Sequence, residues 1–325
     1  MTRRWDDART PWQDGTREDL LAAGLDPAWL RNLVLRSLDE DLGGRPQRAG
    51  GEPEAGRTAG HDVTTEATIS RDAEGVAHLV ARAPGVVAGL PVLPVVLAEV
   101  ANWMDLPVPW ADGLRRDGDR VEKGDVVAFL RGRTQVLLVA ERTSLNLLSR
   151  ASGIATHTRA WADALQGTST RVLDTRKTTP GLRMLEKYAV RCGGGTNKRM
   201  GLFDVAMIKD NHKIAAGSIA AAYSAVVTRF PEVEVQVEVT TVAEAIEAVR
   251  AGARFLLCDN MSVRVLAETV EAARAAAGST PVELEATGGL TLAVAGDYAQ
   301  TKVDYLSVGA LTHSSPILDL ALDLT

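Results

Sequence analysis

The spacing of apolar residues changes near Gly167, and this change divides the chain into two parts. Before that glycine, residues 62–139 contain short apolar runs separated by Asp-Gly and Lys-Gly-Asp turns, which predicts a β-rich region. After it, strand-like runs alternate with Ala-rich segments that have the period of a helix. Strands alternating with helices predict right-handed βα units and a parallel sheet, open or closed into a barrel.

The same patterns predict individual elements. In the first part, Asp26 and Pro27 predict the start of a helix that buries Leu30, Leu33 and Leu38. Strands are predicted at 76–81, 85–89 and 126–130, and a long helix at 137–165. In the second part, the predicted strands are Arg171–Leu173, Val205–Ile208, 233–239, 255–258, 282–285 and 303–308, and the predicted helices are 215–229, 242–251, 263–277 and 292–299.

These elements suggest a domain plan. Residues 1–26 are polar and are predicted to form an arm. Residues 27–140 form a first domain, in which the low-complexity insert 43–60 is predicted to be disordered. Residues 141–170 form a connecting helix, and 171–325 form a catalytic α/β domain whose last residues can return to the first domain.

Composition excludes several classes of protein. Apolar content of 46% and charged content of 24% are typical of a soluble globular protein, and the net charge of −6 argues against general nucleic-acid binding. The two cysteines form no CxxC motif, which excludes a recognisable zinc site and favours a reducing compartment. The sequence shows no signal peptide and no membrane span. We therefore predict a cytoplasmic protein that binds neither nucleic acid nor membrane.

One stretch of the chain is basic. Residues 171–213 contain ten Lys and Arg against four Asp and Glu, a local charge of +6. A basic segment rich in Gly and Thr in an acidic chain predicts a pocket for a small polyanion. Three of its cations follow no strand end and are predicted to be surface charges: Arg183, Lys187 and Lys213.

Polar or glycine-rich residues follow all six predicted strands of the second part. Because the carboxyl ends of parallel strands share one edge of a sheet, these residues predict an active site. Cations suited to carboxylates and phosphates are Arg176, Lys177, Arg199 and Lys209.

Two further kinds of group occupy the same edge. Glu238 and Asp259 end neighbouring strands and are suited to a Mg²⁺ ion that bridges to substrate phosphates. Two glycine turns offer backbone N–H groups to a phosphate, and their residues are Thr287, Gly288, Gly289, Ser307 and Gly309.

Several motifs, in this order, resemble the quinolinate phosphoribosyltransferase family. They are ERTSLN at 141–146, SGIAT at 152–156, DTRKTTPG at 174–181, GGGTN at 193–197, RMGL at 199–202 and IKDNH at 208–212. The resemblance covers the chain from about residue 27 to the C-terminus. It implies an α/β sandwich domain followed by an incomplete parallel α/β barrel.

The resemblance also implies a reaction and a set of residues. Family members are pentosyltransferases of NAD biosynthesis that convert quinolinate and phosphoribosyl pyrophosphate to nicotinate mononucleotide, CO₂ and pyrophosphate with Mg²⁺. Residues matching the family's catalytic positions are Lys177, Lys209, Glu238 and Asp259, the last two also serving the metal. Those matching substrate-binding positions are Arg142, Arg176, Lys177, Lys198, Arg199, Lys209, Thr287, Gly288, Gly289, Ser307 and Gly309. In the family, Arg142 reaches the neighbouring subunit's site, which implies a homodimer or a larger assembly.

One position departs from the family pattern. Family members usually have Asn-His-Arg where this chain has Asn197, Lys198 and Arg199. A lysine keeps the attraction for carboxylates but removes a titratable imidazole, which leaves His212 as the imidazole expected near the site.

Three alternatives stay open at this point. An aldolase or decarboxylase could form a Schiff base on Lys177 or Lys209, and borohydride trapping would distinguish it. A paralogue of the same family, such as the molybdenum-transport-associated members, would use another acceptor. A carrier domain could be built on the Gly-rich turn at 118–124, but that interpretation leaves the six strand ends unexplained.

Overall fold

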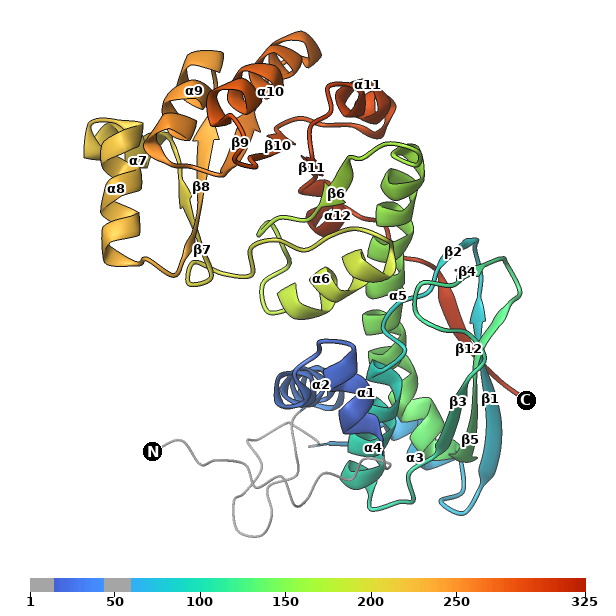
Figure 1. The fold of residues 1–325 in the computed structure, drawn as a ribbon. Coiled ribbons are helices and arrows are strands. Elements are labelled where there is room, and N and C mark those ends of the chain that lie inside the picture. The colour runs from blue at the N-terminus through green and yellow to red at the C-terminus, as the bar shows by residue number, and fades with distance from the viewer. Residues whose placement is uncertain (1–14, 44–59) are drawn as a thin grey trace. The chain divides into compact units, whose positions relative to one another are not determined.

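The protein is described by a computed structural model that covers residues 15–43 and 60–325. Residues 1–14 of the predicted arm, and the predicted disordered insert except Gly43 and Gly60, lie outside the described residues. The chain forms two compact units, one running to Thr156 and including Pro316–Thr325, the other being His157–Ser315. Figure 1 shows both, and each is described by itself.

A four-stranded antiparallel sheet forms the framework of the first unit. Its strands are β1 (Glu74–Ala81), β3 (Trp110–Gly113), β5 (Val126–Arg133) and β12 (Leu320–Leu324), and a separate pair is formed by β2 (Gly85–Val86) and β4 (Arg120–Val121). The order in the sheet is β12-β1-β5-β3. The last strand of the chain thus pairs with the first, as Figure 1 shows.

Helices complete the first unit. They are α1 (Thr16–Ala22), α2 (Pro27–Leu42), α3 (Val63–Thr68), α4 (Val92–Met104) and the start of α5 (Thr134–Ala164), which continues into the second unit. Helix α2 begins as predicted, because the Asp26 carboxylate accepts a hydrogen bond from the Trp29 N–H at 2.8 Å. Within the described residues, no helix combines the length and apolar character needed to cross a membrane.

One prediction for the first part of the chain is wrong. Helix α4 occupies a region in which the sequence predicts only short strands. Its Pro94 lies in the first turn, where the missing N–H removes no intrahelical bond, so the apolar run around it can form a buried helix. Helix α1 lies within the predicted polar arm, where Leu20 is fully buried.

Six parallel strands form the sheet of the second unit. They are β6 (Arg171–Leu173), β7 (Val205–Ile208), β8 (Glu234–Val239), β9 (Phe255–Asp259), β10 (Glu283–Thr287) and β11 (Tyr305–Ser307). The order is β6-β11-β10-β9-β8-β7, and every pair is parallel. At the outer edge of β6, Leu173 forms a parallel bridge with Thr196, and in the described residues no pairing joins β6 to β7. The predicted incomplete barrel is confirmed.

The strands of this sheet are connected by helices. These are α6 (Arg183–Cys192), α7 (Asp210–Ala216), α8 (Ile219–Arg229), α9 (Val242–Ala251), α10 (Val263–Ala277), the 3₁₀ helix η2 (Leu292–Val294), α11 (Ala295–Gln300) and α12 (Ala310–His313). The single helix predicted at 215–229 is wrong. Gly217 ends α7 with a φ of 89°, and Ser218 begins α8 by accepting a hydrogen bond from the Ala221 N–H at 3.0 Å.

The prediction of three surface charges is also wrong. The side chain of Lys187 is 1% exposed and forms an ion pair with Asp174. The Lys213 ammonium lies 2.7 Å from Asp210 and 3.0 Å from Glu244. Arg183 donates hydrogen bonds to the carbonyls of Met200 and Arg176, at 3.0 and 3.2 Å. These cations therefore hold the loops of the basic stretch in place.

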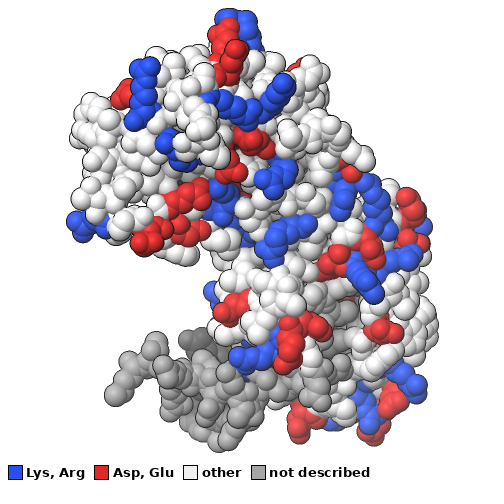
Figure 2. Space-filling view, viewed as in Figure 1, with Lys and Arg blue, Asp and Glu red and all other residues white. Residues whose placement is uncertain are grey.

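Charged side chains of both signs are interspersed on the face shown in Figure 2. Charge on that face is locally balanced, although residues 171–213 carry a surplus of cations. The function of that surplus has to be found in the contacts of its individual residues.

Candidate active site

A cavity of about 750 Å³ lies at the carboxyl ends of the six parallel strands, where ligands of such sheets bind. The structure brings twelve of the predicted site residues together in its lining: Arg176, Lys177, Lys198, Arg199, Lys209, Glu238, Asp259, Thr287, Gly288, Gly289, Ser307 and Gly309. The remaining one, Arg142, is exposed on α5 in the first unit. The individual roles assigned to these residues stay predictions.

Two guanidinium groups lie close together in the cavity. Burial, and then the charge of neighbouring Arg176, lower the pKa of Arg199, while Asp204 opposes the shift. The Arg199 Nε donates to the carbonyl of Gly201 at 2.7 Å, in a loop that the Asp204 carboxylate holds through the N–H groups of Met200 and Gly201. The buried Arg176 Nε has no hydrogen-bond partner among the described residues. A pair of like charges with unused donors is suited to an anion with two carboxylates.

The carboxylates Glu238 and Asp259 extend from the ends of adjacent strands β8 and β9. The Lys209 ammonium lies 2.8 Å from Glu238 Oε2, and Asp259 accepts a hydrogen bond from the Asn260 side chain at 2.9 Å. In the part of the chain that the structure describes, no three His, Cys, Asp or Glu side chains form a group that could hold a metal. Two carboxylates alone fit a Mg²⁺ that keeps waters and arrives with substrate phosphates.

The first glycine turn depends on its lack of side chains. Gly288 has a φ of 94° and Gly289 a φ of 58°. A Cβ on Gly288 would lie 2.3 Å from Asn260 Oδ1, whereas a Cβ on Gly289 would meet nothing within 4 Å. Asn260, itself at a φ of 52°, ties this turn to β9 because its N–H donates to the Thr287 carbonyl at 2.9 Å. The turn is thus packed against Asn260 at Gly288 and has free space at Gly289.

Replacing Gly288 by alanine should lower the free energy of unfolding by about 1–3 kcal/mol, because the new side chain combines a left-handed backbone with a clash. Urea denaturation measures this change. Gly296→Ala is the matched control, since Gly296 lies in α11 and a Cβ there meets nothing within 4 Å. Equal stability of the two variants would contradict the interpretation.

The ammonium group of Lys198 extends away from the strand ends that carry the other cations. It lies 2.7 Å from Glu234 Oε1 and 4.0 Å from the centre of the Phe255 ring, and these two residues begin β8 and β9. The side chain therefore passes along the inside of the sheet. Glu234 would compete with an anionic ligand for this charge.

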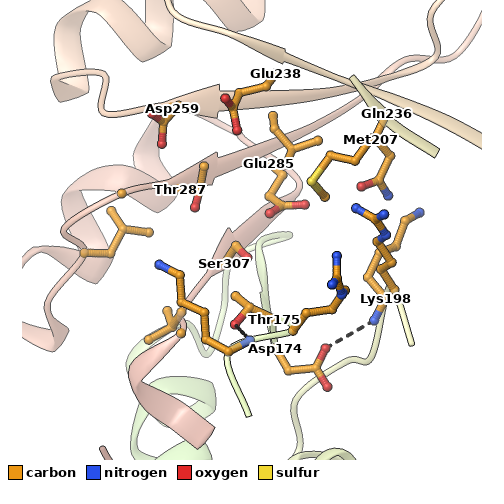
Figure 3. A pocket seen from close by; sticks show the side chains of 18 of the residues that line it. Asp174, Thr175, Lys198, Met207, Gln236, Glu238, Asp259, Glu285, Thr287 and Ser307 are labelled. Atoms are coloured by element: carbon orange, nitrogen blue, oxygen red, sulfur yellow. Dashed lines mark hydrogen bonds between the residues drawn. The ribbon is translucent and has the colours of Figure 1, made fainter. Parts of the chain in front are cut away.

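Sequence reasoning missed a buried network beside this site. Asp174 follows β6, lines the cavity and pairs with Lys187. Its carboxylate also accepts hydrogen bonds from the Asn197 side chain at 2.5 Å and the Lys198 N–H at 3.4 Å, the latter drawn in Figure 3. Burial raises the pKa of Asp174 and lowers that of Lys187, and each shift is opposed by the partner's charge. The network holds the segment with Lys198 and Arg199 beside β6.

The histidine that lines the cavity is also not the one that the sequence predicts. His212 is outside the lining, because its Nδ1 accepts the Lys209 N–H at 2.9 Å and so caps α7. His313 lines the cavity instead, beside Gly309, where a Cβ would lie 3.2 Å from its Nε2. Other lining residues include Gln236 and Glu285. The sequence places Glu285 at the end of a predicted strand but assigns a role to neither residue, and in the structure both lie within strands.

Comparison with known proteins decides the family. Residues 62–152 match the family described as "Quinolinate phosphoribosyl transferase, N-terminal domain", and residues 154–323 match its C-terminal domain. The chain belongs to the quinolinate phosphoribosyl transferase family. The resemblance seen in the sequence motifs is thereby confirmed over most of the chain.

Curated relatives and solved structures agree with this membership. The chain is 42% identical over 299 residues to the nicotinate-nucleotide pyrophosphorylase [carboxylating] of Mycobacterium leprae, covering 90% of this chain and 96% of the relative. It is 39% identical over 277 residues to quinolinate phosphoribosyltransferase [decarboxylating] 1b of Nicotiana tabacum, covering 81% and 77%. The structure of NadC from Streptococcus pyogenes superposes with a TM-score of 0.82 at 33% identity, covering 93% of this chain and 98% of that one. The phosphoribosyl transferase fold therefore accounts for both units.

Proposed function

We propose that this protein transfers the phosphoribosyl group of phosphoribosyl pyrophosphate to quinolinate and releases CO₂, giving nicotinate mononucleotide and pyrophosphate for NAD biosynthesis. The observation that carries the proposal is that two sets of groups line one cavity, the like-charged pair Arg176 and Arg199, and the Glu238 and Asp259 carboxylates with the glycine turns. We assign the first set to one half of the site and the second set to the other. The names of the relatives above describe the same reaction.

The first half of the cavity suits quinolinate. Two carboxylates on one pyridine ring require several cations before they can leave water. The repulsion that lowers the pKa of Arg199 disappears when a dianion binds between Arg199 and Arg176. Arginine grips each carboxylate through two parallel N–H donors, which also fixes the orientation of the ring.

The second half suits the phosphoribosyl donor. Glu238 and Asp259 would hold Mg²⁺, which when bound supplies positive charge for the pyrophosphate leaving group. Gly288, Gly289 and Gly309 line the cavity, and the backbone N–H groups near them would hold the 5′-phosphate. The ring nitrogen brings its own lone pair to C1 of the ribose, so transfer needs fixed charges and no general base.

Contacts of Lys209 disfavour the Schiff-base alternative. A lysine nucleophile has to be desolvated and neutral. The Lys209 side chain is 51% exposed and its ammonium group lies 2.8 Å from Glu238 Oε2, so it is not desolvated. Phosphoribosyl transfer uses that charge directly, since Lys209 can contact the pyrophosphate.

Mass-spectrometric detection of nicotinate mononucleotide and pyrophosphate tests the proposal. The full-length chain is incubated with quinolinate, phosphoribosyl pyrophosphate and Mg²⁺, and nicotinate replaces quinolinate in the control. Product from quinolinate alone is expected. Turnover of another acceptor with none of quinolinate would favour the paralogue, and absence of pyrophosphate would reject phosphoribosyl transfer.

We further propose that the enzyme is a homodimer in which Arg142 completes the neighbouring subunit's site. Co-expressed with Arg176→Ala, the inactive Arg142→Ala chain should recover about a quarter of wild-type activity, because about half of the dimers are mixed and each has one complete site. Activity of the purified mixture measures this.

A mixture of Arg176→Ala and Lys209→Ala is the control for this complementation, because both changes spoil a chain's own site and no mixed dimer has a complete one. Equal recovery in the two mixtures would reject the exchange of Arg142 between subunits.

We also propose that the protein acts in the cytoplasm. Neither Cys192 nor Cys258 is part of a disulfide bond. Cysteines outside disulfide bonds are usual in reducing compartments.

A further inference from the structure

Glu285 is a buried acid in the cavity with no role in the proposed function so far. It lies in the middle of β10, is 5% exposed and lines the cavity. Figure 3 shows its carboxyl group pointing into the cavity, with Met207 on one side and Thr287 and Ser307 on the other. It therefore shares one cavity with the two arginines and with the glycine turns.

Within the part of the chain that the structure describes, the Glu285 carboxyl group forms no salt bridge. Its surroundings are the Ser307 hydroxyl on β11, the ammonium groups of Lys198 and Lys209, the Asp174 carboxylate and the Cys258 thiol on β9. Lys198 is paired with Glu234 at 2.7 Å and Lys209 with Glu238 at 2.8 Å. Burial raises the pKa of Glu285 to about 7, against the hydrogen bond from Ser307 and the two lysine charges. Bound anions favour the protonated form further.

The proposed reaction needs a proton donor for the ring carbon that loses CO₂. The proposal below rests on that reaction. After the ring nitrogen has been alkylated, the bond between the ring and the adjacent carboxylate breaks. CO₂ leaves and the electron pair remains on the ring carbon next to the nitrogen. That carbon must receive a proton before CO₂ recombines with it. It lies one bond from the new glycosidic bond, which forms between the two halves of the cavity.

We propose that the Glu285 carboxyl group donates the proton that replaces CO₂ on the pyridine ring. Its O–H bond breaks as the C–H bond forms, and the resulting carboxylate regains a proton from water when the products leave. The two nearby histidines are placed elsewhere, since His212 caps α7 and His313 borders Gly309. A buried carboxyl group that points into the cavity, and that burial shifts toward its protonated form, is the group best placed for this transfer.

Rapid-quench kinetics of the Glu285→Gln enzyme test the proposal. Glutamine keeps the shape of the side chain but has no acidic proton. Pyrophosphate release should stay within about tenfold of wild type, while CO₂ release falls about 10²-fold or more and the dicarboxylated nucleotide accumulates. Glu285→Asp keeps an acid and should restore part of CO₂ release. Glu268→Gln, an exposed residue paired with Arg264, should match wild type.

Parallel loss of pyrophosphate and CO₂ release in Glu285→Gln would indicate a structural role and overturn the proposal, as would no change in either. The wild-type enzyme offers a second test that does not depend on a variant folding. The ratio of CO₂ release to pyrophosphate release should fall between about pH 7 and about pH 9, as the acid loses its proton. A constant ratio over this range would reject Glu285 as the donor. A wild type that releases no pyrophosphate would instead refute the proposed function itself.

Discussion

Arg176→Ala should lower kcat/KM for quinolinate by about 10²–10³-fold while the fold is retained. Removing one partner of a desolvated, charged contact commonly costs about 2–5 kcal/mol, and each 1.4 kcal/mol is a factor of about ten. Arg176 meets the conditions for such a cost. Its Nε is buried with no partner among the described residues, and its charge acts directly on Arg199. In the variant, a bound carboxylate of quinolinate would lose the positive charge that balances it and the N–H donors that orient it.

Steady-state kinetics with varied quinolinate measure this loss. Arg176→Lys should recover only part of it, because an ammonium group keeps the charge without the planar pair of donors. Arg264→Ala is the matched control, since the Arg264 side chain is 79% exposed and pairs only with Glu268 among the contacts described. Near-normal turnover by Arg176→Ala would refute its assignment to the quinolinate half of the cavity.

Lys187→Met should lower the free energy of unfolding by about 3–5 kcal/mol. Breaking a buried ion pair by removing one partner leaves the other charge buried and uncompensated. Asp174 then has no charged partner, because its carboxylate is fully buried and retains only weaker neutral donors such as Asn197. The shift of its pKa toward the neutral form already reflects this cost of burial. Urea denaturation monitored by circular dichroism measures the change.

Lys123→Met is the control for this variant, because the same substitution at an exposed turn should change stability by no more than about 0.5 kcal/mol. The double variant Asp174→Asn with Lys187→Met should regain part of the loss, since it buries no unpaired charge. If Lys187→Met and Lys123→Met are equally stable, the pair contributes nothing and Asp174 must be stabilised in another way.

The predicted strands of the barrel agree with the structure because each is a local apolar run. The strands Val205–Ile208 and Arg171–Leu173 have the bounds that the sequence predicts. Long-range packing limits the other predictions. Helix α4 is buried on nearly all sides, and such a segment has no amphipathic period that distinguishes it from buried strands. Gly217 divides a predicted helix because its left-handed backbone ends α7.

The sequence by itself determined the family, the alternation of strands with helices and the residues at the strand ends. These properties depend on short-range order: the period of apolar residues, and motifs that lie within a few positions of one another. Once the strands are parallel, their carboxyl ends must meet, so the sequence alone is enough to group Arg176, Lys209, Glu238 and Asp259.

Only the tertiary structure decided how each of these groups is charged and paired. Lys187 is buried by contacts with Asp174, thirteen positions earlier in the chain, and Lys198 pairs with Glu234 at the opposite ends of the strands. Glu285 becomes a buried acid because β9 and β11 enclose it. Desolvation and ion pairing depend on what surrounds a side chain in space, and in a barrel those surroundings come from strands far apart in sequence.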